Sequence, residues 1–304
     1  MSRVFVTGAA GFVGAGIVRQ LLARGHQVAG LCRGDAPRLE GLGPGLNLFR
    51  GDLQDLEALR PALQAFQADG LVHAAWQGVY SDSRQAAAQA RNIELSLNLA
   101  RLAADLGIRR WVAIGSQAEY GTQDSAPSEE LEPVPSTQYG VAKVAAWRAM
   151  QRVASERGAS LAWLRLYSAY GPGSDPRWIL EHVIRQLLRG ERPLLTAGDQ
   201  RWDYLYIDDL GRAVAMVLEQ GCQGIFNLAS GQAPTLRSTL EILRDLINPA
   251  LPLGLGEVPY APGPLPHLEA DVRKLQAATG WAPAMPLREG LVRSIDAVRK
   301  ASAA

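Results

Sequence analysis

Short apolar runs and longer amphipathic stretches alternate along the first half of the chain. Five runs predict buried strands over Arg3–Thr7, Gln27–Cys32, Leu46–Arg50, Leu71–Ala75 and Trp111–Gly115. Apolar residues at helical spacing predict helices over Phe12–Arg24, Leu53–Phe66, Gln85–Leu106 and Tyr139–Arg157. Such alternation is typical of βαβ units around a parallel sheet that is covered on both faces. With Leu161–Leu166 as a further strand, the pattern predicts an α/β fold with a doubly wound parallel sheet.

The pattern becomes less regular after Tyr170. The residues GPGSDP predict a turn, and residues 247–266 are rich in proline and glycine, which predicts loops or short irregular segments. Two further helices are expected over Trp178–Arg189 and Pro286–Lys300. The second part of the chain should therefore form a smaller, less regular lobe.

Composition excludes several classes of protein. The 304 residues include 31 basic and 30 acidic side chains, and this balance argues against nucleic acid or an anionic membrane as the main partner. Two cysteines in a chain of this length indicate no disulfide framework. The chain has no apolar run of the ~18–20 residues that a spanning helix needs. We therefore expect a soluble, cytoplasmic protein, with no metal site.

A glycine-rich turn follows the first predicted strand. In this turn Gly8 permits a tight bend, Gly11 lets the backbone approach a pyrophosphate, and Gly14 lets helix and strand pack closely. Phe12 and Val13 open the helix, whose free N–H groups can bind an anion. The turn therefore predicts a dinucleotide site, although glycines needed only for packing would give the same pattern.

The end of the second strand should select the dinucleotide. Cys32 stands where an acidic residue would bind the adenosine ribose of NAD, and Arg33 beside it can pair with the 2′-phosphate of NADP. NADP is therefore favoured and NAD stays possible, since Arg33 can instead be a solvated side chain while Asp35 reaches the ribose. After the third strand, Asp52 and Leu53 are expected near the adenine, although Asp52 can equally be a helix N-cap.

Tyr139 and Lys143 are the first candidates for chemistry. Their spacing of four residues puts both side chains on one helix face, where an ammonium group can stabilise a phenolate. A pair of this kind also occurs by chance on exposed helices. Ser116 lies just past a predicted strand, where its hydroxyl can bind a substrate carbonyl or alcohol. Together the three residues predict proton transfer at a carbonyl or an alcohol.

At this point the chain resembles the extended short-chain dehydrogenase/reductase family, in particular its branch of nucleotide-sugar 4-epimerases, dehydratases and 4-ketoreductases. The resemblance covers almost the whole chain and rests on an ordered set of motifs: TGAAGFVG, GDL at 51–53, HAA at 73–75, Asn92, GSQAEYG, YGVAK, LRLYSAYGPG and DYLYIDDL at 203–210. It implies that Tyr139 is the general base or acid. It further implies that Lys143 lowers the pKa of Tyr139 and anchors the cofactor, and that Ser116 orients the substrate.

The same resemblance implies further binding residues and a partner. Residues 72–75, with Ala74 and Ala75, would line the cofactor trough together with Asn92, and Leu166 and Tyr167 would lie beside the nicotinamide. The family also implies a homodimer through a four-helix bundle, built here from Gln85–Leu106 and Tyr139–Arg157. The apolar stripes of these two helices would otherwise be ordinary core.

Two departures from the family pattern bear on the substrate. The Asp-Glu pair of the 4,6-dehydratases is replaced by Gln117-Ala118, which cannot transfer protons. The groups that usually hold the substrate diphosphate are also changed, with Ser168, Trp202 and Ala261 at their positions. Nearby cations that can substitute are Arg177, Arg201 and His267. The residues that we expect to contact the substrate are Trp76, Gln117, Ser168, Arg201 and Trp202.

These observations predict a Rossmann domain that binds a dinucleotide over residues 1–165 and a mainly substrate-binding lobe over 166–304, with about 203–230 returning to the main sheet. The expected activity is NAD(P)-dependent reduction of the C4 keto group of a nucleotide-activated sugar or deoxysugar, with Tyr139 as the proton donor or acceptor. The alternatives are a nucleotide-sugar 4-epimerase with tightly bound NAD, a reductase of a non-sugar ketone, and a non-catalytic NADP-binding sensor or scaffold.

Overall fold

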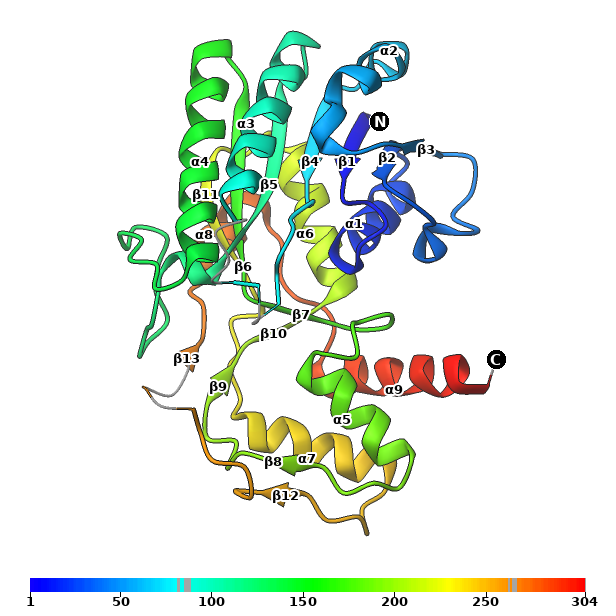
Figure 1. Ribbon diagram of the computed structural model, residues 1–304, viewed down its shortest axis with the longest axis vertical. Coiled ribbons are helices and arrows are strands. Elements are labelled where there is room, and N and C mark those ends of the chain that lie inside the picture. Colours follow the sequence, from blue (N-terminus) through cyan, green and yellow to red (C-terminus); the bar gives the residue numbers. More distant parts are fainter. Residues whose placement is uncertain (81–82, 85–88, 262, 264–266, 304) are drawn as a thin grey trace.

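A seven-stranded, all-parallel sheet forms the centre of the molecule (Figure 1). The fold is seen in a computed structural model that describes residues 1–80, 83–84, 89–261, 263 and 267–303. In spatial order the strands are β11 (Gly224–Leu228), β6 (Ser160–Leu166), β5 (Arg110–Ser116), β4 (Gly70–His73), β1 (Arg3–Thr7), β2 (Gln27–Cys32) and β3 (Leu46–Arg50). The chain order reverses between β1 and β4, so a crevice opens there at the carboxyl ends of the strands. The prediction of a doubly wound parallel sheet is confirmed.

Helices cover both faces of this sheet because successive strand residues point to opposite sides. Phe5 on β1 packs into the core under one layer of helices, formed by α2 (Leu56–Phe66), α3 (Gln89–Asp105) and α4 (Gln138–Arg157). Its neighbours Val4 and Val6 pack on the other face, against α1 (Phe12–Ala23) and α6 (Ile207–Glu219). A short helix, α8 (Arg273–Thr279), contacts β11 and α6.

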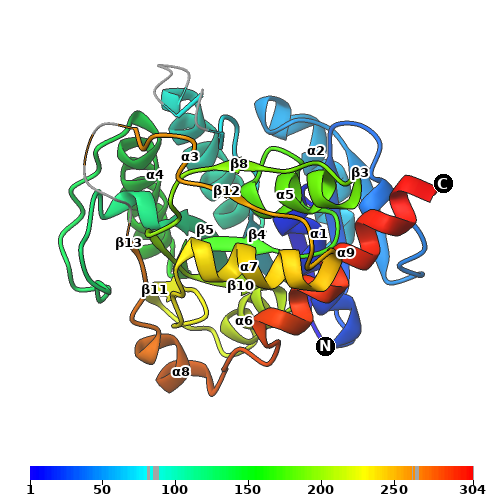
Figure 2. The same cartoon turned by 90° about the horizontal axis from the view of Figure 1, so that it is seen from below.

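The lobe lies beyond the carboxyl ends of the strands, below the sheet in Figure 1. Its helices are α5 (Ile179–Leu188), α7 (Leu236–Ile247) and α9 (Leu287–Ala303), which contact one another in pairs and lie in front of the sheet in Figure 2, where the molecule is seen from below. Three short parallel pairs complete it: β7 (Ser168–Tyr170) with β10 (Tyr204–Tyr206), β8 (Leu194–Leu195) with β12 (Gly254–Leu255), and β9 (Arg201–Trp202) with β13 (His267–Leu268). Its apolar core is continuous with the core under α1 and α6.

Several predicted boundaries are corrected. The fourth strand was predicted to reach Ala75 but ends at His73, because the backbone of Ala75 packs against Gly8 of the glycine turn. The predicted helix over Leu53–Phe66 is split into a 3₁₀ turn η2 (Leu53–Asp55) and α2, since Asp52 caps the first and Asp55 the second. The helix predicted from Gln85 is described from Gln89 onward, and residues 85–88, where its predicted first turn falls, lie outside the described part of the chain.

The segment 203–230 divides between two sheets. Its last strand, β11, pairs with β6 in the main sheet, whereas β10 pairs with β7 in a separate two-stranded sheet. Within the described ranges, none of the helices is long and apolar enough to span a membrane. The same residues include no cluster of His, Cys, Asp or Glu side chains arranged to hold a metal ion.

Candidate active site

The glycine turn between β1 and α1 is shaped by close backbone contacts. Gly8 has a φ of +70°, and a Cβ atom there would lie 2.7 Å from the backbone nitrogen of Ala75. A Cβ atom on Gly14 would collide with the carbonyl of Gly8. Gly11 caps α1 without using a side chain, so the first N–H groups of the helix stay available to an anion. The turn is therefore built to receive a pyrophosphate.

A cavity of about 250 Å³ opens beside this turn. Eight of the predicted cofactor residues line it: Gly8, Gly11, Arg33, Asp52, Leu53, Ala74, Ala75 and Asn92. Trp76, which we predicted as a substrate contact, lines it as well. Phe12, Val13, Gly14, Leu166 and Tyr167 lie outside this lining, on α1 or at the end of β6. The cavity therefore lies where the sequence predicts the adenosine and pyrophosphate parts of a dinucleotide, beside the glycine turn.

The charged groups at the mouth of this cavity face one another. The Arg33 guanidinium lies 3.9 Å from the Asp52 carboxylate and its side chain is 69% exposed. Asp52 also accepts a hydrogen bond from the backbone N–H of Gln54, so it acts as the N-cap of η2. Asp35, the alternative ribose contact, is almost fully exposed and pairs with Arg50 outside the cavity lining. Arg33 is therefore the charged side chain at this mouth with the most freedom to meet a phosphate.

The three predicted catalytic residues are brought together at the carboxyl end of β5. Ser116 ends this strand, and its hydroxyl lowers the pKa of the Tyr139 phenol on the first turn of α4. Lys143, one turn further along α4, donates from Nζ to the carbonyl oxygen of Ile114 at 2.7 Å. All three residues are buried.

Burial controls the acidity of this trio. It raises the pKa of the Tyr139 phenol, while the hydrogen bond from Ser116 and the charge of Arg84 oppose this rise. Burial lowers the pKa of the Lys143 ammonium to about 7, and the carboxylate of Glu119 opposes that fall. Both shifts bring the groups toward their neutral forms, as expected where water is excluded. Lys143 is therefore poised to change its charge near neutral pH.

Trp76 lies against both residues of the catalytic helix. Lys143 Nζ is 3.6 Å from the centroid of the Trp76 ring, and the rings of Trp76 and Tyr139 meet edge to face at 6.0 Å. The indole N–H donates to Gln89 at 2.9 Å. Asn92 exchanges two hydrogen bonds with the backbone of Gln77, so its amide holds the loop after β4. These contacts fix the loop that separates the cavity from the trio.

His73 at the end of β4 supports the same region as a neutral group. Its Nδ1 lies 2.8 Å from Thr7 Oγ1 and its Nε2 lies 3.1 Å from Ser96 Oγ. Ser96 donates its own hydroxyl proton to the carbonyl of Asn92, so it accepts from His73 and the imidazole carries its proton on Nε2. Complete burial and the nearby positive charge of Lys143 lower the pKa of His73 to about 3.

The predicted substrate residues of the lobe, Ser168, Arg201 and Trp202, lie apart from Gln117, which is next to Ser116. Trp202 donates from its indole to Ser168 Oγ at 2.5 Å and stacks on Tyr204, so these residues form one surface at the start of the lobe. Arg201 is exposed and donates to the backbone oxygen of Ala233. The other proposed substitutes are also engaged, Arg177 with Asp175 and His267 with Glu269. Gln117 is half-buried beside Ser116 at the start of the 3₁₀ turn η3 (Gln117–Glu119).

Sequence reasoning missed three charged residues around the trio. Arg84 lies with its guanidinium carbon 4.9 Å from the centroid of the Tyr139 ring. Glu119 and Arg165 form an ion pair at 2.9 Å with no exposed side-chain surface. Two signals could have revealed this pair. Ser116 and Glu119 have the S-x-x-E spacing of a capping box, and Arg165 is a lone charge in an apolar strand, where it needs a partner.

The parallel sheet, the glycine turn and the Ser–Tyr–Lys arrangement together define a Rossmann-fold enzyme of the short-chain dehydrogenase/reductase type. A model of the NAD dependent epimerase/dehydratase family matches residues 4–229, and the chain belongs to this family. The resemblance proposed from the motifs is thereby confirmed. The family and the relatives found here are enzymes.

Named relatives include both reductases and epimerases. The chain is 27% identical over 190 residues to the dTDP-4-dehydro-6-deoxyglucose reductase of Escherichia coli, a match that covers 59% of the chain and 58% of the reductase. It is 26% identical to the UDP-glucose 4-epimerase of Azospirillum brasilense, with 96% of the chain and 90% of the epimerase covered. Among solved structures, MoeE5 in complex with UDP-glucose and NAD is 30% identical, with a TM-score of 0.87 and 99% of each chain covered.

Proposed function

We propose that the chain reduces the C4 keto group of a nucleotide-activated sugar, such as a 6-deoxy sugar, in an NAD(P)-dependent reaction. The observation that carries this proposal is the buried group of Ser116, Tyr139 and Lys143 at the end of β5, in contact through Trp76 with the cavity beside the glycine turn. The relationship to a 4-keto sugar reductase supports the choice of substrate.

Each residue of the trio has a part in this reaction. The Ser116 hydroxyl accepts the backbone N–H of Ala118 and is thereby directed toward Tyr139 and the sugar oxygen. Tyr139 donates its phenolic proton to the C4 oxygen as the alcohol forms, which suits a phenol whose pKa is raised by burial. Lys143 in its charged form stabilises the resulting phenolate. The nicotinamide, when bound, supplies the hydride.

A nucleotide-sugar 4-epimerase is the second candidate. The match to a UDP-glucose 4-epimerase extends over 96% of the chain, compared with 59% for the reductase. An epimerase needs the same trio, because Tyr139 would first accept the proton of the C4 alcohol and later return it. The two functions differ in whether the dinucleotide is consumed.

We further propose that NADP(H) is preferred. Arg33 lies at the mouth of the cavity with most of its side chain exposed, and the acidic residue expected in NAD-specific sites is replaced by Cys32. The solved relative named above holds NAD, and the comparisons do not support a preference for NADP. A direct comparison of the binding of NADPH and NADH tests this proposal.

One assay separates the two functions. The purified enzyme is mixed with NADPH and a dTDP-4-keto-6-deoxy sugar, and in parallel with UDP-glucose and no added dinucleotide. A reductase oxidises one NADPH per ketone converted and leaves UDP-glucose unchanged. An epimerase forms UDP-galactose with no net loss of absorbance at 340 nm. Conversion of neither substrate would overturn both assignments.

The homodimer and the cytoplasmic location remain proposals. Helices α3 and α4 run side by side along one edge of the molecule (Figure 1), where a second copy can complete a four-helix bundle. Val141 on α4 is 45% exposed and belongs to the surface that such a bundle would bury. Analytical ultracentrifugation of the chain and of Val141→Glu tests the dimer.

A further inference from the structure

A buried carboxylate lies directly behind the catalytic trio. Glu119, the last residue of η3, has no exposed surface and accepts three hydrogen bonds. The donors are the backbone N–H of Ser116 at 2.8 Å, the indole N–H of Trp163 at 2.8 Å, and Nε of Arg165 at 2.9 Å. Glu119 thus links a catalytic residue on β5 to two side chains of β6.

The surrounding residues are arranged to admit this carboxylate. Gly115 stands where a side chain would fill the space, because a Cβ atom there would lie 2.6 Å from Oε1 of Glu119. On the other side, the Arg165 guanidinium is held 4.2 Å from the centroid of the Tyr120 ring. Its Nη1 and Nη2 atoms have no hydrogen-bond partner among the described residues. Among the described residues, Glu119 is therefore the one acidic side chain that forms an ion pair with Arg165.

A buried ion pair with two unpaired donors is a costly way to stabilise a fold. Removing charges from water carries a penalty that such a pair often fails to recover, so apolar residues of similar size commonly serve stability equally well. Glu119 and Arg165 are therefore better explained by a role in the neighbouring site. Glu119 reaches that site through the Ser116 backbone and through its charge, which acts on both Lys143 and Tyr139.

We propose that Glu119, held in place by Arg165, is the positioning residue of the active site. It fixes the backbone of Ser116 and supplies the buried negative charge that keeps Lys143 protonated beside Tyr139. The inference rests on the proposed function in that Ser116, Tyr139 and Lys143 are taken as the reacting groups.

The electrostatic part of this role has a definite direction. The charge of Glu119 raises the pKa of Lys143 and also raises that of Tyr139. Among the described residues, His73 from β4 and Arg84 from the loop before α3 also interact with the trio, and Arg165 from β6 pairs with Glu119. His73 has a pKa of about 3, so it does not titrate between pH 5 and 9. Removing the charge of Glu119 should therefore move Lys143 and Tyr139 together to lower pH.

The first experiment measures Lys143 directly in the protein without cofactor or substrate. The lysines of the chain are Lys143, Lys274 and Lys300, so ¹³Cε-labelled lysine gives few NMR signals to assign. In Glu119→Gln, which keeps an acceptor for Ser116 but loses the charge, the midpoint of Lys143 should fall by about one pH unit. In Glu119→Asp, which keeps the charge but shortens the reach, the midpoint should stay close to that of the wild type.

The second experiment measures turnover over pH 5–9. Glu119→Gln should displace the whole pH profile of kcat to lower pH. Glu119→Asp should leave the profile in place and lower kcat by about tenfold, because the Ser116 backbone loses its support. The KM for the dinucleotide should change little in either variant. Glu129→Gln is the matched control, since Glu129 is a buried carboxylate that accepts a backbone N–H from Asn227, away from the trio.

The two experiments can fail independently. An unchanged Lys143 midpoint in Glu119→Gln overturns the electrostatic role, whichever substrate the enzyme uses. An equal loss of kcat in Glu129→Gln and Glu119→Asp overturns the positioning role, since any buried carboxylate would then have the same effect. A shifted midpoint combined with no turnover of any 4-keto or 4-hydroxy sugar nucleotide leaves the role of Glu119 intact and overturns the proposed function.

Discussion

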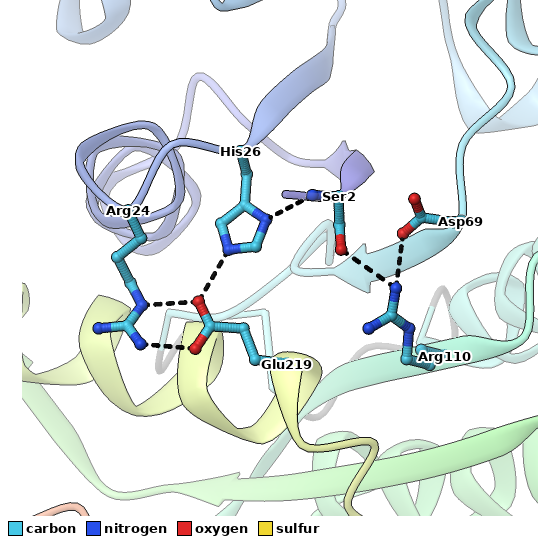
Figure 3. A network of polar contacts seen from close by, with 6 residues as sticks. All are labelled: Ser2, Arg24, His26, Asp69, Arg110 and Glu219. Carbon is cyan, nitrogen blue, oxygen red and sulfur yellow. Dashed lines mark hydrogen bonds and ion pairs between the residues drawn. The ribbon is translucent and has the colours of Figure 1, made fainter.

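Two glutamates, one at each end of the central sheet, each contact three donor groups. They differ in how far they are exposed to solvent and in which residues their charge affects. At the amino ends of the strands, Glu219 accepts from Nε and Nη2 of Arg24 at 2.7 and 2.5 Å and lies 2.8 Å from Nε2 of His26 (Figure 3). At the carboxyl ends, Glu119 is held by Ser116, Trp163 and Arg165. The side chain of Glu219 is 27% exposed, whereas that of Glu119 is fully buried.

Exposure decides what each network does. Glu219 is partly exposed, so solvent can hydrogen-bond to carboxylate lone pairs that have no protein donor. Its contacts connect the end of α1 and the start of β2 to α6. A neighbouring set in Figure 3 connects Arg110 to Asp69 and Ser2 in the same manner. Glu119 has no exposed surface, so bulk solvent does not screen its charge, and the carboxylate acts on Lys143 and Tyr139. The same residue type thus joins neighbouring elements at one end and, in the role proposed above, supports the candidate catalytic residues at the other.

The largest expected effect is confined to the carboxyl end. Tyr139→Phe removes the proton donor and keeps the ring that packs against Trp76, so kcat should fall by about 10²–10⁴-fold while the fold and dinucleotide binding persist. Steady-state kinetics and a thermal melt of the same preparation check this expectation. A variant that keeps more than half of the activity would exclude Tyr139 as the acid.

The second effect contrasts the two ion pairs directly. Arg165→Met leaves a carboxylate buried without its cation and should lower the free energy of unfolding by about 3–5 kcal/mol. Arg24→Met removes a partly exposed partner of Glu219 and should cost less than about 1 kcal/mol. Urea denaturation of both variants gives the comparison. Equal losses would show that burial does not separate the two ends.

Arg33 at the carboxyl end and Arg110 at the amino end provide a third contrast, in their effect on dinucleotide binding. Arg33→Ala should weaken NADPH binding by about 10–100-fold and NADH binding much less, since a charge-assisted hydrogen bond contributes ~1.5–3 kcal/mol and only NADPH carries the 2′-phosphate. Arg110→Ala at the amino end is the control, and it should leave both affinities unchanged. Fluorescence titration measures all four affinities. Equal weakening of both dinucleotides would make Arg33 a surface residue and remove the basis for preferring NADP.

The smallest effect is a pH dependence at the amino end. Hydrogen bonds from Arg24 lower the pKa of Glu219 to about 2, from an ordinary value of 4.5. Because the folded value is the lower one, ionised Glu219 stabilises the fold fully above pH 4.5 and progressively less as the pH falls to about 2. The wild type should therefore melt a degree or two above Glu219→Gln at pH 7, about as expected for an exposed pair, and the gap should close by pH 2. A gap that widens in acid would contradict the assignment.

Much of the fold was predictable because its signals are local. Strand and helix periodicity placed β2 and β3 at their observed bounds, and the glycine turn predicted an anion site from residues that adjoin in the sequence. The spacing of Tyr139 and Lys143 placed both on one helix face, and the motif order identified the family. Boundaries were less predictable where a segment distant in the sequence packs against the end of an element. One example is β4, which ends at His73, two residues before Ala75 packs against Gly8.

The sequence by itself therefore determined the sheet and the glycine turn and predicted the candidate catalytic trio, since each depends on neighbouring residues or on one helical turn. Only the tertiary structure decided which charges surround that trio. Glu119 meets Arg165 across 46 residues of chain, and Arg201 is exposed and donates to Ala233. The electrostatic environment of an active site depends on burial and on distances between distant segments, and neither quantity is set by local sequence pattern.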